Sequence, residues 1–481
     1  MNQNKLIKTQ AYINGEWVNA KDSATFPVFN PATGEVICNV ANLNKSDVTR
    51  TIDDASNAWQ TWRWTTAKER SSLLKKWFEI IVANKEELAR LMTMECGKPL
   101  SESMTEVAYG AGFIEWFAEE AKRNYGEVIP QHTADRRLLT IKQPVGVVGA
   151  ITPWNFPLAM ITRKVGPALA AGCTVVLKPA SETPLTALAL ANFAAQAGIP
   201  AGVFNVITST DNKAVGETLC TNEKIRKLSF TGSTQVGRIL MKQCAGNIKR
   251  ISLELGGNAP FIVFDDANIE NAVKGAMASK YRNAGQTCVC TNRFLVQESV
   301  YDAFVDKLSV ATSALKVGNG LEKNISIGPL INQKGLDKVN EMVGDALSKG
   351  GNVVTGGKHI KGLFFEPTVI ANATPSMMIA KEEIFGPVSP VFKFNTEEEA
   401  LQLANDTIYG LASYFYTNDV NRCWRVAEKL EYGMVGINEG LISTENAPFG
   451  GVKQSGLGRE GSKYGIEEYL EVKYMCYGNV Q

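Results

Sequence analysis

Histidine is scarce in this chain, and its cysteines form no framework. Only His132 and His359 occur among the 481 residues, and both are far from every motif, so acid–base chemistry should fall to carboxylates. The nine cysteines are an odd number at irregular spacing, which is typical of reduced thiols. No Cys/His cluster has the spacing of a zinc site, and we expect no metal centre.

A membrane-spanning run and an excess of charge are also missing. The longest uncharged stretch, residues 183–210, contains Asn192, Gln196 and Pro200, which would be costly in lipid. The net charge is +1, with basic and acidic residues interspersed, so no nucleic-acid surface is indicated. Residues 1–5 lack the apolar core of a signal peptide. We expect a cytoplasmic protein without membrane or nucleic-acid partners.

The length and the apolar pattern predict an α/β protein of two or three domains. Apolar residues recur at helical spacing through residues 67–95, which predicts a long amphipathic helix or a pair of helices ending near Gly97. Buried strands then alternate with helical segments in two series, at 145–151, 174–178, 204–207 and 227–230, and at 261–264, 293–296, 388–392 and 434–438. Such runs predict two parallel sheets covered by helices.

The motifs point to covalent catalysis by a cysteine. Cys288 lies among small and polar residues in NAGQTCVC (283–290), and Glu254 lies in the glycine-bounded LELGGN (253–258). A thiol can attack a carbonyl, and a carboxylate can later activate water. Each signal is weak alone, because most free cysteines are buried packing residues and most glutamates are solvated.

Eight sequence motifs together resemble the aldehyde dehydrogenase superfamily along almost the whole chain. They are FNPATGE (29–35), PWNFP (153–157), KPASETP (178–184), FTGST (230–234), LELGG (253–257), GQTC (285–288), EEIFGP (382–387) and PFGGVK (448–453). Within the superfamily the chain is most similar to the NADP-dependent succinate-semialdehyde dehydrogenases.

The resemblance implies a fold of two parallel-sheet α/β domains plus a small oligomerisation sheet. Residues 1–121 and 145–253 would form the cofactor-binding domain, and 254–455 the catalytic domain. Residues 122–144 and 456–481 would form the oligomerisation segments, whose strands at 135–142 and 469–475 would pair with another subunit. A homo-oligomer, either a dimer or a tetramer, is expected.

The chain has no convincing Gly-x-Gly-x-x-Gly motif of the kind that usually marks a dinucleotide-binding site. Instead, the strand ending at Phe230 leads into Gly232 and Ser233, which could be a plain strand–turn–helix junction or a diphosphate site at a helix N-terminus. The resemblance implies the second reading, and it adds as cofactor contacts Trp154, Asn155, Lys178, Ser181, Leu255, Glu383 and Phe385. Ser181 stands where NAD-selective relatives often carry a glutamate, so NADP is expected, with NAD possible.

The implied reaction begins with attack of Cys288 on the aldehyde and ends with hydrolysis of a Cys288 thioester by water that Glu254 activates. The Asn155 amide and the Cys288 N–H would stabilise the oxyanion. From the motif alone, Asn155 could equally be a turn residue without a catalytic role. Cys290 could form a disulfide with Cys288 under oxidation, or could simply be a packing thiol.

The substrate is expected to carry a remote carboxylate. Arg163, Arg282 and Ser443 match the residues that hold this group in succinate-semialdehyde dehydrogenases, although an isolated arginine is more often part of a surface ion pair. Glutarate semialdehyde differs by one methylene, worth only ~1–3 kcal/mol of discrimination, so a related semialdehyde or a broad aldehyde range stays open.

Two other classes fit the sequence less well. A CoA-acylating enzyme would not need Glu254, so its presence favours hydrolysis. A catalytically silent structural protein would be marked by loss of the nucleophile, but Cys288, Glu254 and Asn155 are all present.

Overall fold

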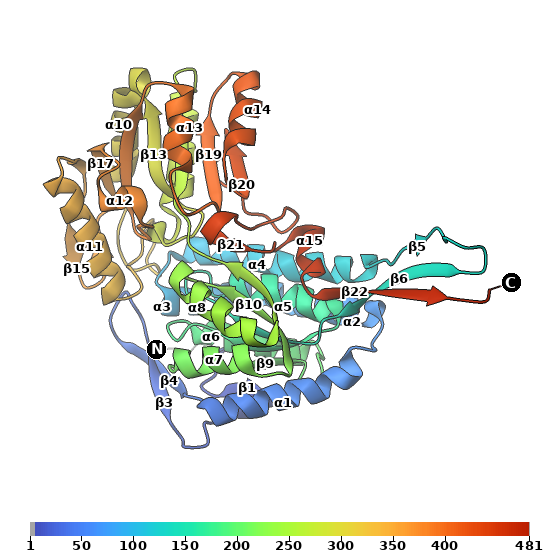
Figure 1. Ribbon diagram of the computed structural model, residues 1–481. Coiled ribbons are helices and arrows are strands. Elements are labelled where there is room, and N and C mark those ends of the chain that lie inside the picture. The colour runs from blue at the N-terminus through green and yellow to red at the C-terminus, as the bar shows by residue number, and fades with distance from the viewer. Residues whose placement is uncertain (1–4, 481) are drawn as a thin grey trace.

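The computed structural model describes residues 5–480, so the first four residues, which bear on targeting, lie outside it. Figure 1 shows two lobes, each built on a sheet covered by helices, and a thin arm that extends from the lower lobe and carries the C-terminus. The expected architecture of two parallel-sheet domains and a small extra sheet is confirmed.

The sheet of the first lobe has eight strands. Its order is β2 (Glu16–Val18), β1 (Ala11–Ile13), β9 (Phe204–Val206), β8 (Thr174–Lys178), β7 (Val147–Ile151), β10 (Ile225–Thr231), β11 (Arg250–Glu254) and β21 (Gly456–Leu457). The strands from β9 to β11 are parallel, whereas β1 and β21 pair antiparallel at either side. The four strands predicted for the first series are therefore β7 to β10.

Helices cover both faces of this sheet because the side chains of its buried strands alternate between two cores. Val148 and Val175 pack with α2 (Ala67–Ala83), α3 (Lys85–Cys96), α4 (Leu100–Glu120), α5 (Ala159–Ala171) and α6 (Pro184–Gln196). Val147 and Val176 pack with α1 (Lys45–Trp62), α7 (Asn212–Thr221) and α8 (Thr234–Cys244). The helix predicted at 67–95 is a pair divided at Asn84, and α3 ends at Cys96 with Gly97 as its C-cap, which has φ 86°.

The second lobe repeats this design. Its sheet has the order β14 (Asn352–Thr355), β17 (Thr368–Ala373), β18 (Val388–Phe394), β13 (Thr291–Gln297), β12 (Ala259–Val263), β19 (Ala412–Tyr416) and β20 (Met434–Ile437), with only β14 antiparallel. One core contains α9 (Ile269–Lys280) and α10 (Glu298–Ser313), and the other contains α11 (Gln333–Ser348), α12 (Met378–Lys381), α13 (Glu397–Asn405) and α14 (Val420–Lys429). The second predicted series corresponds to β12, β13, β18 and β20.

The arm is an antiparallel sheet of β22 (Leu470–Tyr477), β6 (Arg137–Pro144) and β5 (Val128–Ile129). The strands expected at 135–142 and 469–475 are β6 and β22, and they pair with each other from Leu470–Pro144 to Tyr477–Arg137. The segment 456–481 is divided, because β21 joins the first lobe while β22 joins the arm. That the arm pairs with another subunit stays a prediction.

The remaining elements are short. They are the hairpins β3 (Thr25–Phe29) with β4 (Val36–Ala41) and β15 (His359–Lys361) with β16 (Phe364–Phe365), the helix α15 (Ser462–Glu467), and the 3-10 turns η1 (Ala121–Arg123), η2 (Ala245–Asn247), η3 (Arg282–Gly285) and η4 (Lys453–Ser455). None of the helices between residues 5 and 480 is long and apolar enough to cross a bilayer.

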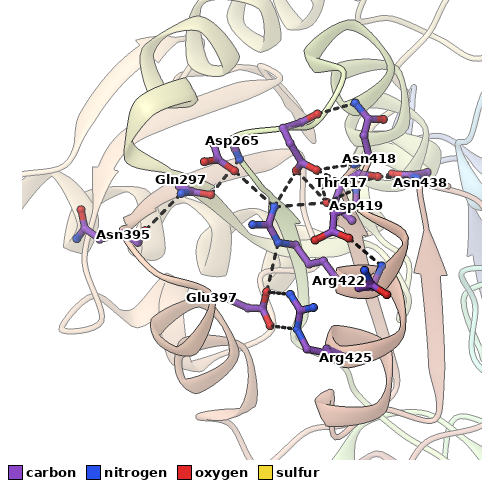
Figure 2. Close-up of polar contacts among 12 residues, drawn as sticks. Asp265, Gln297, Asn395, Glu397, Thr417, Asn418, Asp419, Arg422, Arg425 and Asn438 are labelled. Carbon is purple, nitrogen blue, oxygen red and sulfur yellow. Dashed lines mark hydrogen bonds and ion pairs between the residues drawn. The ribbon is translucent and has the colours of Figure 1, made fainter.

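A polar network joins three connections of the second lobe (Figure 2). Asp266, just after β12, accepts hydrogen bonds from the Thr417 hydroxyl and from the backbone N–H groups of Asn418 and Asp419. Arg422 on α14 pairs with Asp266 at 2.8 Å and with Glu397 of α13 at 3.2 Å. The network thus ties the start of α14 to the end of β12 and to α13.

Candidate active site

Three neighbouring strands of the first sheet end at the same edge. Ile151 of β7 is in register with Lys178 of β8 and with Phe230 of β10. The motifs that follow these strands therefore meet at the carboxyl edge of the sheet, where open parallel sheets bind ligands.

A cavity of about 310 Å³ opens beside this edge, between the two lobes. Eight of the expected site residues line it, namely Trp154, Asn155, Gly232, Ser233, Leu255, Cys288, Glu383 and Phe385. The structure thus gathers residues up to 231 positions apart in the sequence (385 − 154) around the candidate nucleophile. Lys178 and Ser181 lie at the same sheet edge but do not line this cavity.

Cys288 follows a strained turn. Asn283, Ala284 and Gly285 have φ of 50°, 54° and 74°, and a Cβ at Gly285 would lie 2.2 Å from the Gly386 carbonyl oxygen, so only glycine fits there. Gln286 secures the turn, because its Nε2 donates to Asn283 O at 3.0 Å and its Oε1 accepts from Ile331 N at 3.0 Å. Backbone held this way is typical of sites that position a reactive group.

The Cys288 side chain is only partly covered, yet its thiol lies deep in the protein. Burial raises the pKa of this thiol to about 12, and the nearby Glu383 and Glu254 carboxylates raise it further, while Arg163 and Arg282 act in the opposite direction. The thiol is therefore protonated at neutral pH in this state and needs a further positive charge or a proton acceptor to react.

Glu254 ends β11 and is buried, with 3% of its surface exposed. Neither carboxylate oxygen has a hydrogen-bond partner among the described residues. Burial raises the pKa of Glu254 well above its usual range, and Glu460 raises it further, while Lys164 and Arg163 oppose both. A buried carboxylate with two free acceptors is suited to hold and deprotonate a water molecule.

Lys164 and Glu460 were not predicted from the sequence. Lys164 Nζ donates to Glu460 Oε1 at 2.5 Å and to the Ser229 hydroxyl at 3.1 Å, and both charged side chains are almost wholly buried. The signal available was a lysine inside α5, which is buried along its whole length. Its partner lies 296 residues away, and no local pattern indicates such a contact.

The Asn155 amide lies against the nucleophile turn. Its Nδ2 donates to Gln286 O at 3.0 Å, and its Oδ1 is buried without a partner in the described part of the chain. Its backbone carbonyl accepts from Lys98 Nζ at 2.6 Å and from Asn283 Nδ2 at 3.0 Å. These contacts place an amide donor close to the chain that bears Cys288, as an oxyanion site requires.

The cavity has features that fit a dinucleotide. Ser233 caps α8 by accepting from Val236 N at 3.3 Å, so the helix N-terminus faces this edge of the sheet. The Thr231 hydroxyl, also on the cavity wall, is buried and has no partner in residues 5–480. Trp154 and Phe385 form an edge-to-face pair at 5.5 Å, which provides an apolar wall for a flat ring.

Glu383 lies on the same wall. Its Oε1 accepts from Gly257 N at 3.1 Å, and burial raises its pKa to about 7. One carboxylate oxygen is left to accept hydrogen bonds, for example from ribose hydroxyls.

Lys178 is buried, and burial lowers its pKa to about 8, while Glu182 acts to raise it. Its Nζ donates to Asn212 Oδ1 at 2.5 Å and to Pro179 O at 3.2 Å. The Ser181 hydroxyl donates to Glu182 Oε2 at 3.2 Å. A lysine at the strand end and a small hydroxyl residue leave this position open to an added phosphate, which would raise the lysine pKa again.

A second cavity of about 370 Å³ contains two of the three expected substrate contacts. It is lined by Ser101, Glu102, Thr105, Glu106, Tyr109, Phe156, Arg282, Leu441 and Ser443. The Arg282 guanidinium lies 5.1 Å from the Phe156 ring centre. Because Arg282 begins η3, this cavity adjoins the turn that bears Cys288.

Arg163 does not line this cavity. It is 1% exposed, donates from Nη2 to the Tyr109 hydroxyl and pairs with Glu460 at 3.4 Å. Its Nε and Nη1 form no hydrogen bond within the described residues. The structure therefore separates Arg163 from Arg282 and Ser443 by Tyr109, and it pairs the Arg163 guanidinium with Glu460 through Nη1.

Cys290 is a free, buried thiol. Its Sγ donates to Gly285 O at 3.2 Å, and Lys280 Nζ approaches it at 3.7 Å. A disulfide with Cys288 stays an untested alternative. The described residues contain no cluster of three or more His, Cys, Asp or Glu side chains that could bind a metal ion.

Comparison with known proteins agrees with this geometry. The profile of the aldehyde dehydrogenase family matches residues 17–475. The chain is 61% identical to glutarate-semialdehyde dehydrogenase of Pseudomonas putida over 98% of both chains, and 58% identical to the NADP(+) succinate-semialdehyde dehydrogenase of Escherichia coli K12 over 99% of both. The crystal structure of an E. coli NADP-dependent enzyme superposes with a TM-score of 0.98 at 57% identity, covering 99% of this chain and 100% of the other. The family profile and these relatives, which match almost the whole chain, show that the chain belongs to the aldehyde dehydrogenase family.

Proposed function

We propose that this protein oxidises succinate semialdehyde to succinate, with NADP as the preferred cofactor. The observation that carries the proposal is the cavity in which Arg282 and Ser443 adjoin the turn bearing Cys288. A guanidinium and a hydroxyl suit a carboxylate, which would sit at the far end of a short aldehyde whose carbonyl reaches the thiol.

Cys288 would act first. Its thiol loses a proton to solvent, the resulting thiolate attacks the aldehyde carbon, and the Asn155 amide and the Cys288 backbone N–H donate to the oxyanion that forms. Loss of one such donor typically costs ~100- to 1000-fold in rate. When bound, the nicotinamide cofactor would accept the hydride that converts the Cys288 adduct to a thioester.

Several residues of the first cavity would hold that cofactor. Gly232 and Ser233 would bind the diphosphate at the start of α8, while Trp154, Leu255, Glu383 and Phe385 would position the nicotinamide riboside. Lys178 and Ser181 would bind the adenosine ribose and its phosphate. Replacing Ser181 with glutamate should reverse the preference toward NAD, because a carboxylate repels the 2′-phosphate and accepts from the free hydroxyl.

Glu254 would then complete the cycle. One of its two unpaired oxygens accepts a proton from water, and the resulting hydroxide attacks the thioester and releases the acid and the Cys288 thiolate. Arg163, whose Nη1 pairs with Glu460 and whose Nε has no hydrogen-bond partner among the described residues, would contact the carboxylate end of the substrate after a shift of Tyr109.

Glutarate semialdehyde is the second candidate, because the P. putida relative with 61% identity is named for it. The added methylene must fit the same cavity, and discrimination at this level is worth only ~1–3 kcal/mol.

Initial rates with succinate semialdehyde, glutarate semialdehyde and butanal, each with NAD and NADP, test the proposal. Arg282→Ala should lower kcat/KM for succinate semialdehyde by ~30- to 1000-fold and leave that for butanal little changed. Equal losses for both aldehydes would remove the support for a remote carboxylate. The cytoplasmic location and the homo-oligomeric state stay predictions.

A further inference from the structure

One face of α4 contacts three separate parts of the active site. Glu102, Glu106 and Tyr109 follow one another at helical spacing, and all three line the cavity that contains Arg282. Glu106 Oε1 accepts from Leu158 N at 2.9 Å and Ala159 N at 3.2 Å at the start of α5, and its Oε2 pairs with Lys98. The Tyr109 hydroxyl accepts from Arg163.

Glu102 has the most direct contact with the nucleophile turn. Its Oε2 accepts from the Asn283 backbone N–H at 2.7 Å, although the two residues are 181 positions apart. Asn283 is the first of the three consecutive residues with positive φ, so this bond holds the chain where it enters the left-handed turn. Backbone in this region persists in non-glycine residues only when its surroundings over-determine it.

The same bond sets the direction of Arg282. The peptide group that Glu102 holds is the one joining Arg282 to Asn283, so its rotation would move the Arg282 side chain and the Asn283 amide together. Asn283 Nδ2 in turn donates to the Asn155 carbonyl oxygen. The Glu102 carboxylate thus couples the position of the Arg282 side chain in the cavity to that of Asn283 and its contact with Asn155.

A carboxylate is otherwise unfavourable at this place. An anion in the wall of a cavity that accepts an anionic substrate repels that substrate. The charged groups facing Glu102 are Lys98, Arg282 and Glu106, and burial raises its pKa to about 7 even though the Asn283 N–H, Lys98 and Arg282 all lower it. A hydrogen-bond acceptor that anchors the turn explains why the position is nevertheless acidic.

We propose that Glu102 is a positioning residue that fixes Arg282 in the substrate cavity and thereby sets the preference for aldehydes with a remote anionic group. The inference rests on the proposed function, because Arg282 matters for selectivity only if the substrate carries that group. Glu102 itself forms no bond with the substrate.

The kinetic test compares Glu102→Ala, which removes the acceptor, with Glu102→Gln, which keeps an oxygen that can accept from Asn283 N. Glu115→Ala is the matched control, since Glu115 is an exposed carboxylate on the same helix. Glu102→Ala should lower kcat/KM for succinate semialdehyde about tenfold or more, chiefly through KM, and lower that for butanal less than about threefold. Glu102→Gln should recover most of the loss, and Glu115→Ala should match the wild type.

Hydrogen–deuterium exchange of the peptide spanning residues 282–287 supplies a readout that needs no substrate. Exchange should be faster in Glu102→Ala than in the wild type or in Glu102→Gln, because the Asn283 N–H loses its acceptor. If Glu102→Ala fails to fold, Glu102→Ser replaces it, since its hydroxyl is too short to reach Asn283 N.

The outcomes separate the two claims. The role of Glu102 is overturned if Glu102→Ala changes neither the ratio of kcat/KM for succinate semialdehyde to that for butanal nor the exchange of residues 282–287. It is also overturned if Glu102→Gln loses as much as Glu102→Ala. Arg282→Ala losing activity equally toward both aldehydes overturns the proposed function instead, and with it the selectivity claim, whatever the exchange shows.

Discussion

Cys288 and Glu254 must both be ionised for their proposed roles, and the surroundings of each disfavour its charged form. Burial raises the pKa of each, and a charged Glu254 raises the pKa of the thiol further. The two side chains are therefore best charged one at a time. That suits a reaction in which the thiol acts first and the carboxylate acts only after the thioester has formed.

Glu254→Gln should stop turnover after the first half of the reaction. Without the base, the thioester persists on Cys288, and steady-state kcat should fall by ~100- to 10,000-fold. Rapid mixing should show a burst of about one NADPH per site followed by almost no further absorbance change. Cys288→Ala should show no burst, and steady turnover near the wild-type rate in either variant would refute the assignment.

Glu460→Gln should shift the pH dependence of turnover. Glu460 raises the pKa of Glu254, while Lys164 and Arg163 lower it, so removal of its charge leaves two buried cations that favour ionised Glu254. The pKa of Glu254 should fall, and the acid limb of kcat should move to lower pH. A profile with an unchanged or higher acid limb would contradict this electrostatic reading.

The variant should also be less stable, since breaking a buried pair costs about 3–5 kcal/mol.

Among the elements, strands and helices with strong periodicity were predictable and long-range pairings were not. The runs at 174–178 and 293–296 are mainly apolar, and each is buried in a central strand of its sheet. By contrast, β21 is two residues long and takes its place only by pairing with β11, about 200 residues earlier in the chain (456 − 254 = 202). No local pattern can indicate a strand whose stability comes wholly from its partner.

The same division applies to the site. Cys288, Glu254 and the cofactor motifs lie in short sequence motifs, and the structure places eight of the expected residues around one cavity. The burial of Arg163 beneath Tyr109, the Lys164–Glu460 pair and the Glu102–Asn283 bond depend on residues that meet only after folding. Sequence patterns report which residues are present, whereas these contacts depend on how the lobes pack.

The polar network of Figure 2 predicts an element-level effect on stability. Arg422 bridges Asp266 and Glu397 with 20% of its side chain exposed, while Arg425 pairs with Glu397 alone and is 46% exposed. Arg422→Ala should lower the free energy of unfolding by ~1–3 kcal/mol, and Arg425→Ala should lower it by clearly less. Thermal scans of the two variants measure the difference, and equal effects would show that the bridge adds nothing beyond a surface pair.

The network should also weaken in acid. Partial burial acts to raise the pKa of Asp266, but hydrogen bonds from Thr417 and Asn418 and the charge of Arg422 outweigh it, so the pKa is lowered. Its contribution is therefore present above the ordinary aspartate pKa and is lost as pH falls through the folded value.

At the scale of the whole molecule, the arm presents apolar side chains to solvent on an edge strand, whose outer side has no partner strand within residues 5–480. Val472, Tyr474 and Tyr477 on β22 are 66%, 56% and 54% exposed, and β22 forms the outer edge of its sheet. Exposed apolar edges of this kind invite pairing with another chain.

Val472→Asp should therefore weaken the expected self-association, because it places a charge on that edge. Light scattering after size exclusion should show a smaller assembly than the wild type, and Lys473→Asp is the control for charge alone. An unchanged mass for Val472→Asp would show that the arm does not hold subunits together.

The position of β21 and Glu460 has a consequence for synthesis. The sheet of the first lobe begins with strands near residue 11, but its edge strand β21 comes from residues 456–457. Glu460, which raises the pKa of Glu254, follows three residues after that strand. When synthesis has reached residue 450, Cys288 and Glu254 have been translated, but β21 and Glu460 have not. Domains otherwise tend to fold in order of their emergence. A product terminated before residue 456 would therefore lack the strand and the charged neighbour that complete the surroundings of Glu254.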